Sequence, residues 1–368
     1  CMYCAVDGFS AKLDATPGVI AFADCVYVLA EKRTRAILPT DYISKTVGYP
    51  YTDVESVSEE TMTEVNTLLE TILPDEGVRD CLERALSLSL EGVNRFSKMF
   101  VLTSPGGSGK SIILGIMAAA MGEYTGSVSM SLLTSADATD SSAHTSQLDS
   151  LRGKRFVKLA ESSARKENGR RHTLYSGALK TLTGEEDIQS RGLYKDFSPM
   201  TIRCVLYPCF NTLPVLDETT ASITRRLVVI DFPERFVARS VYDPSDPHQH
   251  IEDPSLKERV KGWGPAFIRV LLEAHSRVTL HGEFIVPESC RRSTMSYVES
   301  SNPVLCFLQE TLRPVGNDEE APPIRRSELY RRYLSWCEAN HATKESVKVF
   351  VSKLEETEYQ SKRIHGIP

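Results

Sequence analysis

The sequence predicts an α/β fold built on a parallel sheet, and two observations carry this prediction. Short apolar runs recur between residues 98 and 238 with polar loops between them, as expected of strands that are covered on both faces. A glycine-rich run at 104–111 joins the first apolar run to a longer apolar stretch, 112–121, that predicts a helix. The short runs lie at 99–102, 156–160, 205–210 and 227–232.

Segments of other character precede this predicted core. β-Branched and aromatic residues at 19–29 predict a β segment or hairpin, and 30–55 resembles an extended connection. Helical spacing follows over 56–97, where three patterns mark possible helix starts. These are Ser56-x-x-Glu59, Thr61-x-x-Glu64 and Pro74-Asp75.

Polar and helical segments complete the chain. The stretch 134–150 is rich in serine and threonine and is predicted as a loop, and 239–262 is predicted as a connection between domains. Apolar residues recur at helical spacing near 267–274, 327–339 and 344–355, and 359–367 is a candidate β hairpin. The predicted parts are a β and extended region (1–55), a helical collar-like region (56–97), the core (98–238), a helical connection (239–299) and a winged-helix-like module (300–368).

Composition restricts the class of protein. The chain has 368 residues, 41% hydrophobic and 25% charged, with a formal net charge of −6, which is typical of a soluble globular protein with room for two or three domains. It has neither an 18-residue apolar stretch nor a basic-then-apolar leader, so we expect no membrane partner and no secretion. Its nine scattered cysteines favour reduced thiols in a cytosol-like compartment. It begins with Cys1, so we expect it to be part of a longer protein.

The run SPGGSGKS at 104–111 has the composition of a phosphate-binding loop (P-loop). Glycines allow backbone N–H groups to turn onto phosphate oxygens, and the following helix adds the positive end of its dipole. The expected cradle is Gly106, Gly107, Ser108 and Gly109, while Lys110 reaches the β- and γ-phosphates and Ser111 holds Mg²⁺. Ser104 stands where the usual pattern has its first glycine.

Two polar residues at strand ends are candidates for hydrolysis. Glu161 ends the apolar run 156–160, where a carboxylate can hold Mg²⁺ through water or orient the attacking water. Asn211 ends the run 205–210, where an amide can bind the γ-phosphate or that water. As alternatives, Glu161 is a solvated strand end and Asn211 is a turn residue.

Basic residues mark two further candidate contacts. Arg225 or Arg226 can stabilise the γ-phosphate of a neighbouring subunit, although a surface arginine pair is the alternative. Residues 150–203 carry 12 Lys+Arg against 6 Asp+Glu, and Tyr194-Lys195 pairs a ring with a cation. Such groups line grooves for single-stranded nucleic acid, with a solvated charged face as the alternative.

Five motifs in register resemble the superfamily 3 helicases, and more narrowly the helicase half of the primase–helicases of large DNA viruses and phages. The amino part, IAFADCVYVL with PTDYISKTVGYPY, is similar to the domain that precedes this ATPase, although Asp24-Cys25 replaces its usual Asn-Gly. The carboxy part, with VPESC, NPVLCFLQE and ELYRRYLSWCEAN, is similar to its winged-helix end. The motifs are SPGGSGKS (104–111), VKLAES (157–162), LKTLTGEEDIQSRGLYKDF (179–197), LYPCFNTLP (206–214) and ITRRLVVIDF (223–232).

The resemblance implies an AAA+-like ATPase core that forms a hexameric ring. Such a ring hydrolyses ATP with Mg²⁺ at its subunit interfaces and moves along single-stranded or forked DNA during replication. It also implies a cytoplasmic or virus-replication compartment, replication partners and an upstream primase domain. The roles implied by position are phosphate and Mg²⁺ binding for Lys110 and Ser111, the acidic motif for Glu161, the polar sensor for Asn211, the trans-acting finger for Arg225 or Arg226, and DNA contact for Lys180, Arg191, Tyr194 and Lys195.

Two other classes of function share these features. A P-loop DNA-packaging motor or a small-molecule kinase also needs the phosphate loop, and an ATP-dependent loading scaffold binds nucleotide without unwinding. A kinase needs an arginine-rich lid, and the sequence offers no obvious one. The presence of Glu161 and Asn211 favours hydrolysis over a scaffold.

Overall fold

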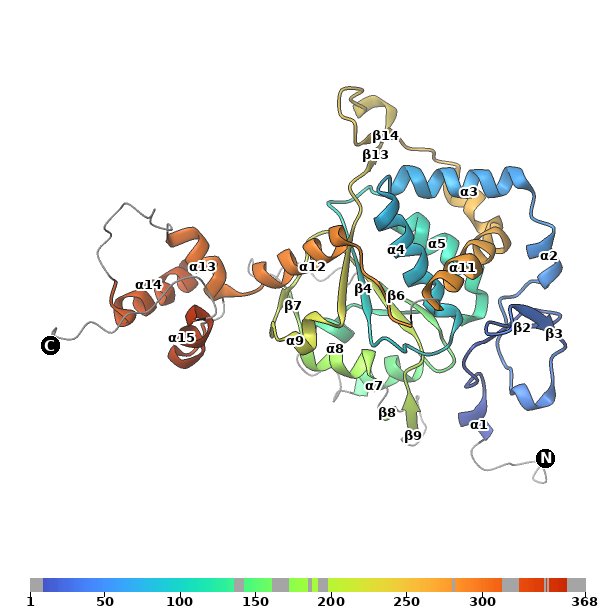
Figure 1. The fold of residues 1–368 in the computed structure, drawn as a ribbon, viewed down its shortest axis with the longest axis horizontal. Helices are drawn as coiled ribbons and strands as arrows, with labels where there is room; N and C mark the ends of the chain where they lie inside the picture. Colours follow the sequence, from blue (N-terminus) through green and yellow to red (C-terminus); the bar gives the residue numbers. More distant parts are fainter. Residues whose placement is uncertain are drawn as a thin grey trace.

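A parallel five-stranded sheet forms the centre of the molecule (Figure 1). The computed structural model describes residues 9–135, 142–160, 172–184, 187–190, 198–279, 282–312, 324–340, 342 and 344–355. The strands lie in the order β12-β4-β10-β6-β5, and every neighbouring pair is parallel. Their bounds are β4 Met99–Thr103, β5 Thr125–Ser129, β6 Phe156–Ala160, β10 Val205–Phe210 and β12 Leu227–Asp231.

Four of these strands confirm the predicted apolar runs. Alternate side chains of β4 enter two different cores: Phe100 and Leu102 face one side of the sheet, and Met99 and Val101 face the other. The edge strand β5 was not predicted, because its sequence TGSVS has one large apolar residue, Val128.

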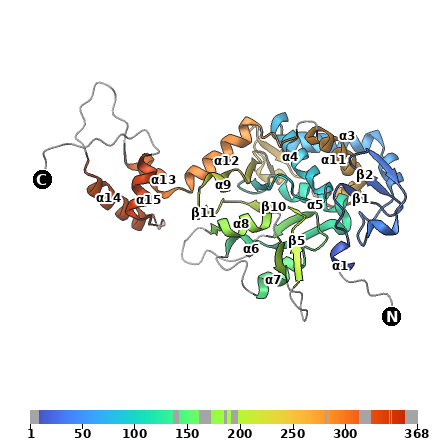
Figure 2. The ribbon, with the colours of Figure 1, turned by 60° about the horizontal axis from the view of Figure 1, so that its bottom comes forward.

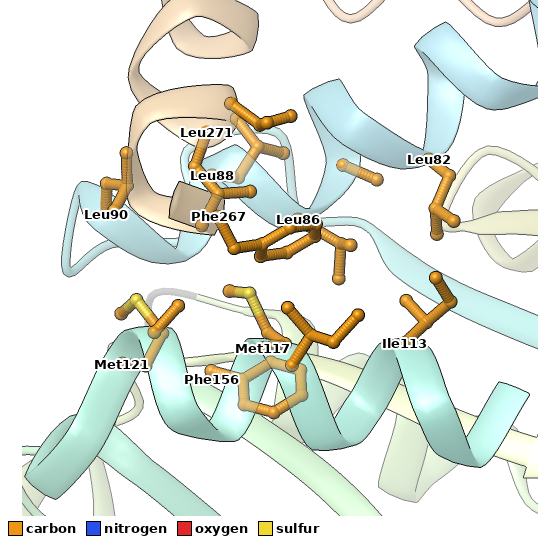
Figure 3. Close-up of a cluster of buried hydrophobic side chains, with 14 of the residues drawn as sticks. Leu82, Leu86, Leu88, Leu90, Ile113, Met117, Met121, Phe156, Phe267 and Leu271 are labelled. Atoms are coloured by element: carbon orange, nitrogen blue, oxygen red, sulfur yellow. The ribbon is translucent and has the colours of Figure 1, made fainter. Parts of the chain in front are cut away.

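Helices cover both faces of the sheet. α3 Glu59–Ile72, α4 Glu76–Ser87, α5 Lys110–Met121 and α11 Gly264–Thr279 bury their apolar residues in the first core. Figure 3 shows side chains of α4 and α11 facing Ile113, Met117 and Met121 of α5, with Phe156 of β6 beneath them. The second face is covered by α6 Ser131–Thr134, α7 Ser142–Asp149, α8 Ser176–Thr183, α9 Ala221–Thr224 and α12 Glu288–Ser300.

The helix starts in the helical region differ in part from the predictions. Asp75 caps α4, since its Oδ1 accepts from the backbone N–H of Val78 at 3.0 Å, as expected. Both predicted capping boxes are wrong, because Ser56 ends α2 Tyr51–Glu55 and Ser58 is the residue that caps α3, accepting from the N–H of Thr61 at 3.1 Å. Ser56 belongs to the end of α2, so it cannot also cap the start of α3. The sequence patterns did not predict α2.

The amino region is a small antiparallel meander beside the helices (Figure 1). The predicted hairpin is confirmed as β1 Val19–Ala21 and β2 Val26–Val28. The prediction of an extended connection over 30–55 is wrong in part, because β3 Arg33–Arg35 extends the meander and α2 is helical. Arg155, buried at the start of β6, ties the meander to the core by donating to the carbonyls of Val19 (2.7 Å) and Leu90 (2.9 Å).

Two segments predicted to lack regular structure contain helices or strands. The polar stretch 134–150 was predicted as a loop, but α7 forms there because Leu148 is drawn into the second core. The predicted connection 239–262 includes β14 Gln249–Ile251, which pairs in parallel with β13 Arg235–Val237, and α10 Leu256–Arg259. We call residues 233–253, which carry β13 and β14, the ribbon.

The carboxy-terminal helices form a third core at the end of the molecule remote from the meander (Figure 2). α13 Pro303–Thr311, α14 Arg326–Ala339 and α15 Val347–Glu355 pack around Phe307, Tyr333 and Phe350. The predicted helices are confirmed, and the candidate hairpin at 359–367 lies outside the described residues, so the winged-helix assignment remains a prediction.

Short elements complete the described chain. Among the described residues, no helix combines the length and hydropathy needed to cross a bilayer. The remaining elements are α1 Phe9–Lys12, β7 Thr173–Leu174, β8 Asp187–Ser190, β9 Ser198–Thr201, β11 Val215–Leu216, and the 3₁₀ turns Pro39–Asp41, Leu88–Leu90, Gly122–Tyr124, Arg239–Val241 and Val260–Gly262.

Replacing Phe267 by alanine tests the first core. Phe267 is fully buried on α11 between α4 and α5, so Phe267→Ala is expected to lower the free energy of unfolding by about 3–5 kcal/mol. Urea unfolding followed by circular dichroism measures this change. The control Ile37→Ala removes an exposed apolar side chain, and a similar loss in both variants would contradict the packing described here.

Candidate functional site

The glycine-rich loop, residues 104–109, connects the carboxyl end of β4 to the amino end of α5. Gly106, Gly107 and Gly109 all have positive φ angles, of 116°, 64° and 87°. A Cβ atom on Gly109 would lie 2.8 Å from the side chain of Ile72, and one on Gly107 would lie 3.2 Å from the carbonyl oxygen of Phe236. The backbone conformation and the neighbours therefore require glycine here, and the loop leads directly into the amino end of α5, where the helix dipole favours an anion.

Two serines hold the lysine of this loop. The hydroxyl oxygens of Ser104 and Ser108 are 2.6 Å apart, and both residues are buried. The Lys110 ammonium, also largely buried, donates to Ser104 Oγ and lies 3.5 Å from Ser108 Oγ. Ser104, which replaces the first glycine of the usual motif, thus acts together with Ser108, because their hydroxyls hold the ammonium over the loop.

A cleft of about 950 Å³ opens beside the loop. Its polar part includes the loop from Gly106 to Ser111, together with Lys158 of β6 and Asn211. Asn211 lies next to the loop because β10 pairs with β4 and the N–H of Ser104 donates to the carbonyl of Phe210 at 3.2 Å. The cleft therefore combines the expected cradle, Lys110, Ser111 and Asn211, and it can hold a phosphate chain with a hydrated cation.

Arg225 and Arg226 lie at the opposite end of the sheet from the loop. They precede β12, whose first residue pairs with Met99 at the start of β4, so a five-residue strand of about 17 Å separates them from the loop. Lys98 Nζ donates to the Arg225 carbonyl at 2.6 Å, and the Arg225 side chain is exposed. Arg226 donates to the Ser222 carbonyl at 2.7 Å, and its burial, with the charge of Arg225, lowers the pKa of its guanidinium.

The predicted DNA-contacting residues are placed only in part. Lys180 lies on α8 and forms an ion pair with Glu218 at 2.9 Å, and the hydrogen bond from Lys180 lowers the pKa of that carboxyl. β8 and β9 pair antiparallel just after α8. Arg191, Tyr194 and Lys195, between these two strands, lie outside the described residues, as does Glu161 directly after β6.

The sequence reasoning did not identify the ribbon as part of the cleft. Phe236 of β13 lines the cleft, and its N–H donates to the carbonyl of Gly107 at 2.7 Å. Glu252 and Asp253, which follow β14, line it as well. No motif marks these residues, since they belong to a Pro-, Asp- and His-rich segment that resembles a linker.

A buried carboxylate holds the ribbon together. Glu234, 3% exposed, lies 2.9 Å from His248 Nδ1 and 2.6 Å from His250 Nε2. The hydrogen bond to Glu234 raises the pKa of His248, so their attraction is full below the ordinary histidine pKa and is lost as the pH rises through the raised value. Within the described part of the chain, no group of three or more His, Cys, Asp and Glu side chains is arranged to hold a metal ion.

Comparisons with known proteins bear on the resemblance predicted from the motifs. A model described as a family of unknown function, DUF5906, matches residues 102–226. The chain is 28% identical over 344 residues to "Putative helicase L207/L206" of Acanthamoeba polyphaga mimivirus, covering 91% of this chain and 34% of that protein. It is 25% identical over 353 residues to "Putative helicase 121R" of Invertebrate iridescent virus 3, with 90% and 36% covered.

A virophage protein and solved structures extend the comparison. "Putative helicase V13" of Sputnik virophage is 24% identical over 246 residues, covering 65% of this chain and 31% of that protein. Two apo structures of the NrS-1 C-terminal region match with TM-scores of 0.44 and 0.45 at 15% and 13% identity, covering 67% and 69% of this chain and 52% and 57% of those chains.

The curated relatives agree with one another, since each is named a putative helicase. The chain spans about a third of the length of the curated relatives it matches. Over nearly all of its own length it is related to proteins named as helicases in large DNA viruses, which confirms the resemblance predicted from the motifs.

Proposed function

We propose that this chain is the ATPase part of a superfamily 3 helicase that acts in the replication of a viral or phage-type genome. The observation that carries the proposal is the glycine-rich loop at the end of β4, with Lys110 held over it and Asn211 of the neighbouring strand beside it. Ligands of open parallel sheets bind outside the carboxyl ends of the strands, and the loop lies there. The viral relatives named as helicases support this function.

The bound nucleotide in this proposal is ATP with Mg²⁺. Backbone N–H groups of Gly106, Gly107 and Gly109 cradle the phosphates, and Lys110 moves from Ser104 onto the β- and γ-phosphate oxygens. Ser111 lines the cleft, so its hydroxyl can hold the Mg²⁺, which neutralises the charge that develops on the phosphates.

Asn211 and Glu161 complete the hydrolytic group. Asn211 is exposed and lines the cleft at the end of β10, where its amide can orient the attacking water against the γ-phosphate. Glu161 follows β6, the neighbour of β10, and we assign it the acidic role that the resemblance implies.

The arginines act between subunits in this proposal. Arg225 and Arg226 are separated from the loop of their own chain by the length of β12, so neither reaches its own phosphate site. The exposed side chain of Arg225 is free to enter the cleft of a neighbour in a ring, which we propose to be a hexamer. We choose Arg225 over Arg226 because Arg226 is partly buried and bound to Ser222.

The β8–β9 pair is the proposed contact with single-stranded or forked DNA. The sequence between the two strands includes Arg191, Tyr194 and Lys195, which supply cations for phosphates and a ring for a base. Lys180 of α8, which is partly exposed and paired with Glu218, is the further proposed DNA contact before this segment.

The domain division and the cellular setting are part of the same proposal. The predicted division at residues 55, 97, 238 and 299 stands as a proposal, with the carboxy-terminal helices as a winged-helix-like module. Because the chain spans about a third of its relatives, we propose a primase domain elsewhere in the whole protein, and action in the cytoplasm or a virus-replication compartment.

Lys110→Ala is expected to reduce ATP turnover by about 100-fold or more, because it removes the cation that stabilises charge on the transferred phosphoryl group. A coupled ATPase assay with and without single-stranded DNA measures the effect. Lys261→Ala, which removes an exposed lysine bound to Glu258, is the matched control. Unchanged turnover in Lys110→Ala contradicts the site.

Strand displacement on a forked DNA duplex distinguishes a helicase from a packaging motor or a loading scaffold. The wild-type protein is expected to displace one strand with ATP, and Lys110→Ala is expected not to. DNA-stimulated ATPase activity without strand displacement indicates a packaging motor, and ring formation without either activity indicates a loading scaffold.

Mixed rings test the action of Arg225 in trans. Lys110→Ala and Arg225→Ala are each expected to be inactive, but an equal mixture restores roughly a quarter of the sites, those pairing an intact loop with an intact arginine from the neighbour. The ATPase rate of the mixture measures this recovery. If rings made only of Arg225→Ala subunits hydrolyse ATP, Arg225 is not the trans-acting arginine. A mixture of Lys110→Ala with Arg226→Ala subunits then tests Arg226 in the same way.

A further inference from the structure

Part of the cleft lining is apolar, and the phosphate chemistry does not use it. Leu68 and Ile72 of α3, Leu114 of α5, Phe236 of β13 and Leu256 of α10 line it together. A phosphate chain gains nothing from this surface, because anions lose hydration on apolar walls. The apolar part of the lining therefore fits an uncharged part of the ligand.

Phe236 is the aromatic ring among these residues, and its backbone fixes it to the loop. Its N–H donates to the Gly107 carbonyl at 2.7 Å, and its own carbonyl oxygen lies close to the Gly107 Cα, where a Cβ would meet it at 3.2 Å. The ring is partly buried and packs against the first core. It is thus held at a constant position relative to the phosphate cradle.

A second ring backs Phe236. His250 of β14 stacks on it with a centroid distance of 5.2 Å and an interplanar angle of 28°. His250 Nε2 is bound to the buried Glu234 at 2.6 Å, and Glu234 also holds His248. Since His250 stacks on Phe236 and is itself bound to a buried carboxylate, these contacts hold the Phe236 ring in place beside the cleft that it lines.

Charged side chains of both signs line the cleft. Lys110 and the start of α5 lie in its polar part, while Glu252 and Asp253 enter from the ribbon, with Lys257 of α10 beside them. The carboxylates of Glu252 and Asp253 disfavour phosphate beside them, which leaves Lys110 and the loop as the part of the lining that suits the phosphates.

We propose that Phe236, backed by His250 and anchored through Glu234, is the ring on which the base of the bound nucleotide packs. This inference rests on the proposed function, because it assigns the base end of the same site. Aromatic stacking tolerates any base, since every base has a π-face, and it grows with ring area. The site therefore prefers purine to pyrimidine triphosphates and discriminates weakly between ATP and GTP.

Inorganic tripolyphosphate distinguishes phosphate binding from base binding, because it has the phosphate chain of ATP and no base. Titration calorimetry with Mg²⁺ on the whole chain compares ATP with tripolyphosphate. Phe236→Ala and Phe236→Leu are expected to weaken ATP binding about tenfold and tripolyphosphate binding less than about twofold. Phe236→Trp is expected to retain ATP affinity, and Val241→Ala, an exposed apolar residue just after β13, is the control.

The outcomes are distinct. Equal weakening of both ligands by Phe236→Leu overturns the inference, since Phe236 would then only support the loop, and the proposed function would stand. Unchanged ATP affinity in Phe236→Ala and Phe236→Leu also overturns it. If the wild-type protein binds neither ligand, the proposed function fails and the inference fails with it.

Discussion

The close packing of the glycine-rich loop between α3 and the ribbon is the constraint on which the rest of the site depends. Gly109 has no room for a Cβ beside Ile72, and Gly107 lies against the Phe236 carbonyl. Ile72 and Phe236, which lie far apart in the chain, thus restrict the conformation of the loop 104–109. The helical region and the ribbon therefore both contribute to the lining of the cleft.

The serines of the loop give the motif its particular form. A first-position glycine in the usual pattern has no side chain, whereas Ser104 and Ser108 here supply hydroxyls that hold the Lys110 ammonium. A buried cation is costly without such partners, so the serine at position 104 is coupled to the position of the lysine. The departure from the motif is therefore compatible with phosphate binding.

The parallel register of the sheet decides which groups share a site. Asn211 and the loop meet because β10 and β4 end at the same edge, while Arg225 lies at the other end of β12. A single chain therefore presents the glycine-rich loop at one edge and an exposed arginine at the opposite edge. This polarity is what a head-to-tail ring requires, in which each interface pairs unlike surfaces.

The sequence by itself determined the strands with continuous apolar runs, the helices with regular apolar spacing and the loop that joins β4 to α5, because each depends on local chemistry and on burial of a single face. It did not predict β5 or α7, whose few apolar residues are buried only in the assembled second core. The tertiary structure alone decided that Phe236, Glu252 and Asp253 border the cleft, since a hydrogen bond that spans more than a hundred residues joins the ribbon to Gly107. It also decided that Arg225 is remote from its own loop, because strand order and register are properties of the sheet and not of any one segment.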